Sequence, residues 1–265
     1  MVATNMSTIS LKKRDELILK HIYEYNITLV EIVHQLFFED LKIGAAESTL
    51  RRLREKHGLI TREKLYGGRK KYFRLTPKGG EIIGKEVGGE EFKTGKVASS
   101  FANLHFLCVQ PKGIVRTKCN PKHHPKLFPS TTNPPARIDF YISENKLENP
   151  ESPSVSLGAI VPDLNSKSRR IIDRCVNHSR NFMERGWFAG AMKAGRFEIT
   201  VLTGTEGKKK AIQANLNREL RRKLRSAVLR NGLDSPIRFP VRTDVVVIPG
   251  LNLLIPKSKR SGNKN

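Results

Sequence analysis

Four residues in the middle of the chain have the types and local spacings of a zinc site. Two residues separate His105 from Cys108, and three separate Cys119 from His123. Structural zinc sites use four such nitrogen and sulfur ligands in closely spaced pairs. However, His105 and Cys108 lie in a short apolar run, residues 104–109, where a strand would point them to opposite faces. We therefore expect a buried cysteine and a hydrogen-bonded histidine, with a zinc site as the alternative.

Other patterns that support catalysis are missing from the sequence. There is no glycine-rich phosphate loop followed by Lys-Ser or Lys-Thr, and no Gly-x-Ser-x-Gly turn that would present a nucleophilic serine. Cys108, Cys119 and Cys175 do not make a disulfide framework, so we expect reduced thiols and no bound cofactor. Trp187 follows a predicted helix and is expected in a core, with base stacking beside Arg185 as the alternative.

The N-terminal part of the chain is predicted to form three helices. Apolar residues recur at helical spacing around residues 17–22 and again over residues 28–38. After a turn at Gly44, residues 45–57 form a third helix with basic residues outside, and Gly58 ends it.

A hairpin and a short helix are predicted next. Residues 59–66 and 70–75 flank Gly67 and Gly68, which is the signature of a β-hairpin, and basic residues lie at its tip. Thr76 suits a helix cap and Pro77 a first helical position, so a last short helix should follow. The order of these elements is that of a winged helix-turn-helix.

The segments GLITRE and GGRKKYFRLTPKG resemble prokaryotic winged-helix families of DNA-binding proteins. In such folds the third helix lies in the major groove and nearby basic residues neutralise phosphates. The resemblance implies DNA contacts by Ser48, Thr49, Arg51, Arg52, Arg54 and Lys56 on the third helix, and by Arg69, Lys70 and Lys71 on the hairpin. The alternative is a solvated basic face on a winged helix that binds protein.

Composition favours a polyanionic partner. The 265 residues include 49 Lys and Arg against 25 Asp and Glu, which gives a formal charge of +24 and a pI near 10.2. We expect salt-sensitive binding to nucleic acid. With no long apolar span and no signal peptide in the sequence, we expect a soluble, cytoplasmic protein associated with the nucleoid or a plasmid, and no membrane partner.

The chain length favours two domains. We predict a winged helix-turn-helix domain over residues 10–84, a linker over 85–97, an α/β domain over 98–254 and a disordered basic tail over 255–265. Residues 101–109 form a strand or a short helix running into one, and residues 111–135 are irregular. The predicted α/β elements are strands at 136–142, 155–161, 197–203 and 244–249 and helices at 169–185 and 208–230.

This order of elements resembles the replication-relaxation family of plasmid and mobile-element proteins. Members join an N-terminal winged helix to a domain similar to PD-(D/E)xK nucleases. In the matching positions, His105 corresponds to the family's histidine, and Asp139 in ARIDFYI to its first aspartate. Val161-Pro162-Asp163 falls where the family has Glu-x-Asp, and RFEITVLTGT matches the later strand. The resemblance implies an α+β and α/β two-domain fold with a nuclease-like second domain.

The departure at Val161 weakens the implied catalytic site. A metal-dependent nuclease holds its cation with two or three carboxylates and places a basic group near the phosphate. Here only Asp139 and Asp163 remain as oxygen ligands, with Lys167 as the nearby cation. Asp139 can instead satisfy a loop amide. We therefore expect an inactive nuclease-like domain that needs no cofactor, and Mg²⁺ or Mn²⁺ only if the domain cuts DNA.

The leading hypothesis is a protein that binds double-stranded DNA in plasmid or element replication and its control. Its second domain would dimerise or add phosphate contacts through Arg218, Arg221, Arg222 and Arg225. One alternative is a metal-dependent DNA endonuclease, and another is a winged-helix transcriptional regulator. The sequence gives neither the target site nor the host.

Overall fold

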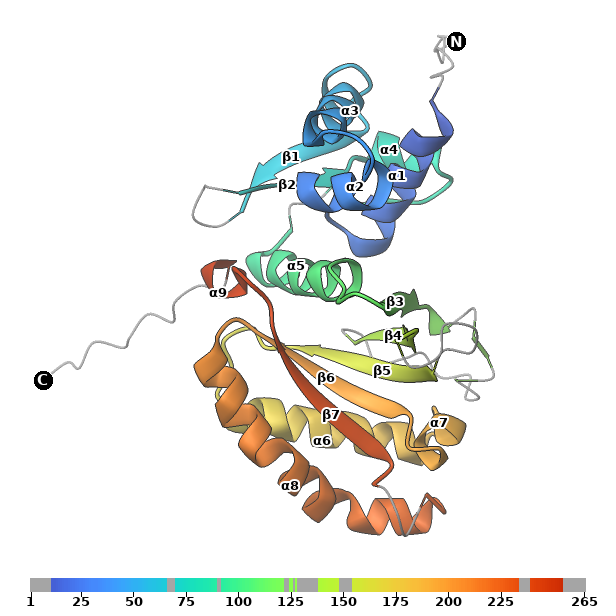
Figure 1. Ribbon diagram of the computed structural model, residues 1–265, viewed down its shortest axis with the longest axis vertical. Helices are drawn as coiled ribbons and strands as arrows, with labels where there is room; N and C mark the ends of the chain where they lie inside the picture. The colour runs from blue at the N-terminus through green and yellow to red at the C-terminus, as the bar shows by residue number, and fades with distance from the viewer. Residues whose placement is uncertain are drawn as a thin grey trace, which may run out of the picture. The chain divides into compact units, whose positions relative to one another are not determined.

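The computed structural model describes residues 11–65, 70–89, 92–121, 124–125, 127, 138–147, 154–233 and 239–254 (Figure 1). Arg69, His123 and the predicted tail over residues 255–265 lie outside this described part. The chain divides into two compact units, Met1–Leu104 and His105–Asn265. Helix α5, Thr94–Cys108, begins within the predicted linker and crosses the division.

The first unit contains the predicted three helices, hairpin and short helix. They are α1 Lys13–Tyr25, α2 Val30–Phe37, α3 Ile43–Glu55, β1 Ile60–Lys64, β2 Lys71–Leu75 and α4 Pro77–Ile82. β1 and β2 pair antiparallel. Thr28, between α1 and α2, adds a bridge to Phe73, and the two residues exchange N–H to C=O hydrogen bonds of 2.9 Å. The prediction of a turn at Gly44 is wrong, because Gly44 lies within α3.

The position of helix α3 in the first unit is set by its buried apolar side and by the turn at its C-terminal end. Ala46, Leu50 and Leu53 are fully buried in the core of the first unit, at the spacing of one helix face. Gly58 ends the helix with φ of +67°, a conformation that favours glycine. The Leu59 N–H then donates to the Leu53 carbonyl at 2.9 Å. The residues opposite the buried side are therefore held outward on a well-anchored helix.

The second unit is a mixed α/β arrangement around one five-stranded sheet. Its strands are β3 Ile114–Cys119, β4 Asp139–Asn145, β5 Ser154–Pro162, β6 Phe197–Thr203 and β7 Val241–Val247. They are ordered β3-β4-β5-β6-β7, antiparallel from β3 to β5 and parallel from β5 to β7. The helices are α6 Ser168–Glu184, α7 Ala189–Lys193, α8 Glu206–Arg230 and α9 Leu251–Leu254. Figure 1 shows α6 and α8 side by side along one face of the sheet.

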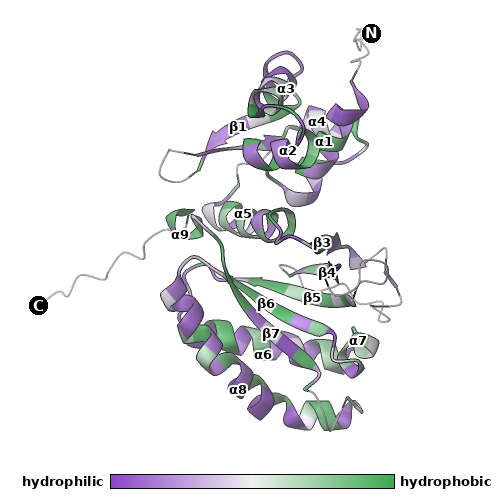
Figure 2. Cartoon of the chain, in the orientation of Figure 1, coloured by the Kyte–Doolittle hydropathy of each residue, from purple (hydrophilic) through white to green (hydrophobic). Residues whose placement is uncertain are grey.

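The core of this unit lies between that face and the two helices. Alternate residues of the strands enter it, and α8 contributes Ile212, Leu216, Leu220 and Leu224 at a spacing of four. Purple and green therefore alternate along α8 in Figure 2, while β5 and β6 are mostly green. Trp187 is 0% exposed and lies among Phe140 and Phe182, with ring centroids 6.5 and 5.9 Å away. The predicted core position of Trp187 is confirmed.

The opposite face of the sheet carries a polar network. Tyr141 on β4 is paired with Gly158 on β5, and Gly158 is paired with Glu198 on β6. The Tyr141 hydroxyl donates to Glu198 Oε1 at 2.9 Å and lies 2.7 Å from Thr200 Oγ1. A Cβ atom at Gly158 would fall on the Tyr141 ring, so glycine leaves the space for this ring. Burial raises the pKa of Tyr141 and keeps its hydroxyl protonated.

Several predictions for the chain after the hairpin need correction. The strand expected around residues 101–109 is absent, because α5 continues through Cys108. β3 lies within the stretch predicted to be irregular. The last strand begins at Val241 and ends at Val247, three residues before its predicted start and two before its predicted end.

Among the described residues, no helix combines the length and apolar character needed to span a bilayer.

Candidate nucleic-acid interface

The outward side of α3 is the first candidate surface. Glu47, Arg51 and Glu55 are exposed at a spacing of four, and Ser48 is exposed three residues before Arg51, so all four lie opposite the buried side. Ser48 and Arg51 were predicted contacts, whereas Glu47 and Glu55 give the stripe a mixed charge that the sequence prediction did not consider. A helix face with a hydroxyl, a guanidinium and two carboxylates has donors and acceptors suited to base edges in a major groove.

Arg52, another predicted contact, is tied to a buried carboxylate. Its guanidinium donates to Asp15 Oδ1 at 2.7 Å, and Asp15 is only 2% exposed. The second oxygen of Asp15 accepts the backbone N–H of Lys12 at 3.1 Å. Arg52 therefore links α3 to the start of α1. Of the remaining predicted contacts on α3, Arg54 pairs with Glu55, Lys56 is exposed, and Thr49 is half-buried.

The hairpin presents lysines beside the start of α2. Lys70 and Lys71 are both exposed, and Lys70 Nζ lies 3.9 Å from Glu31 Oε1 in the first turn of α2. Both partners are more than half exposed, so this contact contributes little stability and leaves the lysine available.

Arg74 of the same hairpin faces inward. It is 9% exposed and binds Glu63 across the two strands. Burial would raise the pKa of Glu63, but hydrogen bonds from Tyr72 and Arg74 outweigh it and hold the pKa below its usual value. Arg74 is therefore part of the hairpin's structure rather than of its cationic surface.

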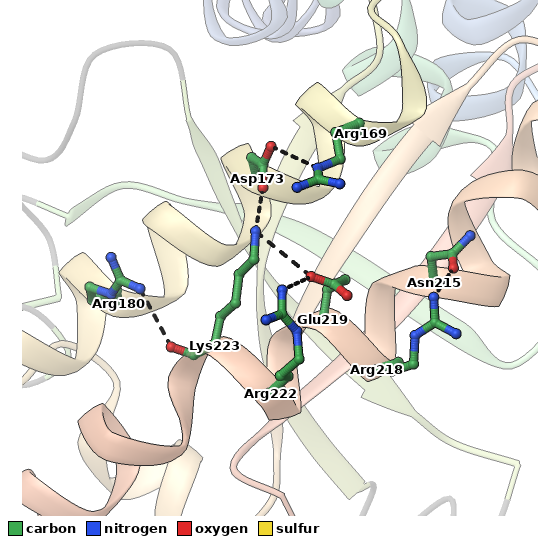
Figure 3. A network of polar contacts seen from close by, with 8 residues as sticks. All are labelled: Arg169, Asp173, Arg180, Asn215, Arg218, Glu219, Arg222 and Lys223. Atoms are coloured by element: carbon green, nitrogen blue, oxygen red, sulfur yellow. Dashed lines mark hydrogen bonds and ion pairs between the residues drawn. The ribbon is translucent and has the colours of Figure 1, made fainter.

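Helix α8 forms the second candidate surface. It carries nine basic residues and two acidic ones. Figure 3 shows that some of these charges bind α6 or their own helix. Lys223 Nζ lies 2.6 Å from Asp173 Oδ1 and 3.7 Å from Glu219 Oε2, and Arg180 of α6 donates to the Lys223 carbonyl at 3.4 Å. Lys223 thus joins the two helices, a role that sequence spacing could not reveal.

The four predicted arginines of α8 differ in their surroundings. Arg222 donates to Glu219 at 2.7 Å, and Arg218 donates to Asn215 at 2.5 Å. The Arg221 guanidinium lies 5.8 Å from the Phe239 ring centroid. Arg225 is exposed on the same helix. Arg222 is still 62% exposed despite its partner, so all four arginines remain on the surface of the unit.

The two carboxylates implied by the nuclease resemblance belong to separate ion pairs. Asp139, at the start of β4, lies 3.0 Å from Lys118 Nζ on β3. Asp163, just after β5, is 1% exposed, lies 2.8 Å from Lys208 Nζ and accepts the Ser166 N–H at 3.0 Å.

These carboxylates also lie on different sides of the sheet. The strand register places Asp139 on the same face of the sheet as Tyr141. Asp163 instead contacts Thr203 of β6, and the alternate β6 residues on the side of Thr203 belong to the core that faces α6 and α8. The structure therefore does not bring them together as ligands of one cation. Lys167, the third candidate, is exposed just before α6.

The zinc candidates are placed on different elements. His105 and Cys108 lie one turn apart on α5, and Cys119 ends β3 in the core of the second unit. Burial raises the pKa of Cys119 to about 11, which disfavours the thiolate that zinc requires. Among the described residues, no three His, Cys, Asp or Glu side chains form a metal-binding group.

Comparisons with known proteins give no family for this chain. No family model matches it, and no curated protein matches it. The candidate functional surfaces are therefore those described above: α3 with the hairpin, and α8 with α6.

Proposed function

We propose that this chain is a duplex-DNA-binding protein whose first unit is a winged helix-turn-helix. Helix α3 enters the major groove, and the β1–β2 hairpin is the wing that contacts the flanking backbone. The observation that carries the proposal is the outward stripe of α3, with Ser48 and Arg51 at its centre, on a helix anchored by Leu50 and Leu53. The bridge between Thr28 and Phe73 supports it, because it fixes the hairpin beside the helices.

The second unit adds phosphate contacts through α8. Its exposed arginines contact the backbone without reading sequence, which fits the net charge of +24. The likeness of its sequence to the replication-relaxation family supports a role in plasmid or element replication and its control. Asp139 and Asp163 belong to separate ion pairs, which supports a domain that does not cleave phosphodiester bonds.

Replacing Arg51 with alanine should relax sequence preference. A duplex recovered from a random library with the wild-type chain should bind the variant roughly tenfold or more weakly, because a guanidinium contact to a base edge is worth about 1–3 kcal/mol. Binding to a scrambled duplex should change far less. Gel retardation of both duplexes at one salt concentration measures the two affinities.

Lys20→Ala is the matched control for Arg51→Ala, since Lys20 is an exposed cation on α1 rather than on α3. It should leave the ratio of the two affinities unchanged. Equal weakening of both duplexes by Arg51→Ala would contradict the groove assignment and favour a solvated or protein-binding face.

The proposal also predicts no metal-dependent cleavage. The wild-type chain and Asp139→Ala should both leave supercoiled and single-stranded DNA intact with Mg²⁺ or Mn²⁺, because Lys118 rather than a second carboxylate faces Asp139. Nicking assays over time measure this. Cleavage by the wild type that Asp139→Ala removes would instead make the chain an endonuclease.

A further inference from the structure

A small hollow lies beside the outward stripe of α3 in the first unit. It has a volume of about 270 Å³ and is lined by the start of α1, the residue after α2 and the middle of α3. Ser48, Thr49 and Arg52 line it from α3, and Lys12 and Arg14 from the start of α1. Three residues predicted to enter the groove thus share a concave site with two cations that the sequence prediction did not single out.

The hollow is positively charged, and two of its cations, Arg14 and Arg52, are held in place. Arg14 lies over the Phe38 ring, with its guanidinium carbon 4.6 Å from the ring centroid, and Phe38 is only 5% exposed. Arg52 is held by the buried Asp15. Both oxygens of Asp15 already accept hydrogen bonds, one from Arg52 and one from the Lys12 N–H. Three cations therefore outweigh one carboxylate whose oxygens are engaged.

The size and chemistry of the hollow fit a phosphate group. Pockets that enclose drug-sized ligands occupy roughly 300–1,000 Å³, so this one is small for an organic effector. Its lysine, two arginines and two hydroxyls are the side chains that most often bind phosphate oxygens in protein–DNA complexes. We propose that this hollow binds one phosphodiester of the DNA backbone and so sets the register of α3 in the groove.

The position of the hollow relative to α3 supports this occupant, and the inference rests on the proposed function. Ser48 belongs both to the outward stripe and to the lining of the hollow. Arg51 projects from the stripe, while Arg52, one residue on, points to Asp15. A helix in the major groove has a sugar–phosphate backbone along each side. A base-facing stripe and an adjoining phosphate site are therefore expected together.

The test uses two double variants of the full chain that remove equal charge from α1. Lys12→Gln with Arg14→Gln changes the hollow, whereas Lys13→Gln with Lys20→Gln removes two exposed cations that do not line it. The Lys12 backbone N–H that caps Asp15 stays in both variants. Affinities for the selected and the scrambled duplex are measured over a salt series, and circular dichroism melts check that both variants are folded.

Losing one phosphate contact should lower the magnitude of the slope of log K against log salt by about 1. The hollow variant should show this lower slope relative to the matched variant and should bind both duplexes weaker by the same factor, roughly tenfold. Equal slopes for the two variants would overturn the phosphate site while leaving DNA binding intact. A changed preference between the duplexes would assign the hollow to base reading. A wild-type chain that binds neither duplex would instead overturn the proposed function.

A second arm separates the DNA backbone from free phosphate. The wild-type chain and the hollow variant are melted without DNA while inorganic phosphate replaces chloride at constant ionic strength. We expect the same melting temperature change in both proteins, because the site needs the rest of the duplex for useful affinity. Saturable stabilisation of the wild type alone would assign the hollow to a small free anion and overturn the backbone assignment.

Discussion

Replacing Trp187 with alanine should lower the free energy of unfolding of the second unit by about 3–5 kcal/mol. Trp187 is fully buried, and its ring is stacked on Phe182 and edge-on to Phe140. Removing it leaves a cavity at the point where α6 ends and the chain turns toward α7, and the surrounding rings cannot all move in to fill it. Among the described residues, Trp187 is the largest fully buried side chain.

Urea unfolding followed by far-UV circular dichroism measures this loss. The chain has one tryptophan, so its fluorescence cannot be used for the variant. Leu229→Ala is the matched control, because Leu229 is apolar but 56% exposed and should change stability by no more than about 0.5 kcal/mol. A variant of Trp187 that stays as stable as wild type but binds single-stranded DNA less tightly would restore the base-stacking alternative.

Acidification from pH 7.5 to 5 should destabilise the first unit by about 2 kcal/mol through His21. This histidine is 7% exposed, lies between the Tyr25 and Phe37 rings, and its Nε2 is 3.0 Å from Thr28 Oγ1. Burial lowers its pKa from 6.5 to about 4. Between these values the unfolded chain binds a proton that the folded chain does not, so stability falls as pH falls through this window. Each pH unit below 6.5 costs about 1.36 kcal/mol, down to about pH 4.

The variant His21→Gln isolates this contribution. Glutamine can keep a hydrogen bond to Thr28 but has no proton to gain. Between pH 7.5 and 5, the unfolding free energy of the variant should therefore fall by about 2 kcal/mol less than that of the wild type. The measured quantity is the difference in unfolding free energy between the two pH values, compared between variant and wild type. The same pH dependence in both proteins would show that His21 is already protonated in the folded state or solvated there.

The elements that the sequence predicted best have a strong one-sided pattern. Residues 197–203 were predicted as a strand and form β6, because Phe197, Ile199 and Val201 alternate with the polar residues Glu198 and Thr200. In α8 the apolar residues recur every fourth position, and the helix follows from that spacing. In the first unit, a glycine pair and a helix cap marked the hairpin and α4, and Thr76 Oγ1 accepts the Gly79 N–H at 3.0 Å.

The errors occur where that contrast between faces is lost. Helix α5 is buried almost all round from Val97 to Cys108, so its apolar run could not be distinguished from a strand by periodicity. β3 alternates between half-buried and exposed residues at the edge of the sheet, with lysine and arginine among them. Such a strand has no apolar signal to separate it from the proline- and lysine-rich segment around it.

For the candidate interface, sequence could indicate the helix but not the partners of its side chains. Ser48 and Arg51 follow from the helical period of α3. The pair Asp15–Arg52 joins residues 37 positions apart, and the hollow beside it depends on three elements packing together. Periodicity and motif spacing contain no information on such contacts. The same applies to Lys118 facing Asp139, where the register of two strands decides the neighbour.

The packing of Tyr141 over Gly158 limits how this sheet could be redesigned. Raising β-propensity along every strand is a common route to more stable proteins, and it would introduce valine or isoleucine at position 158. The new side chain would displace the Tyr141 ring and separate its hydroxyl from Glu198 and Thr200, so that a buried hydroxyl would lose both of its hydrogen-bond partners. At this position the sheet requires a residue of low strand propensity, so any stabilised version of the protein should keep glycine there.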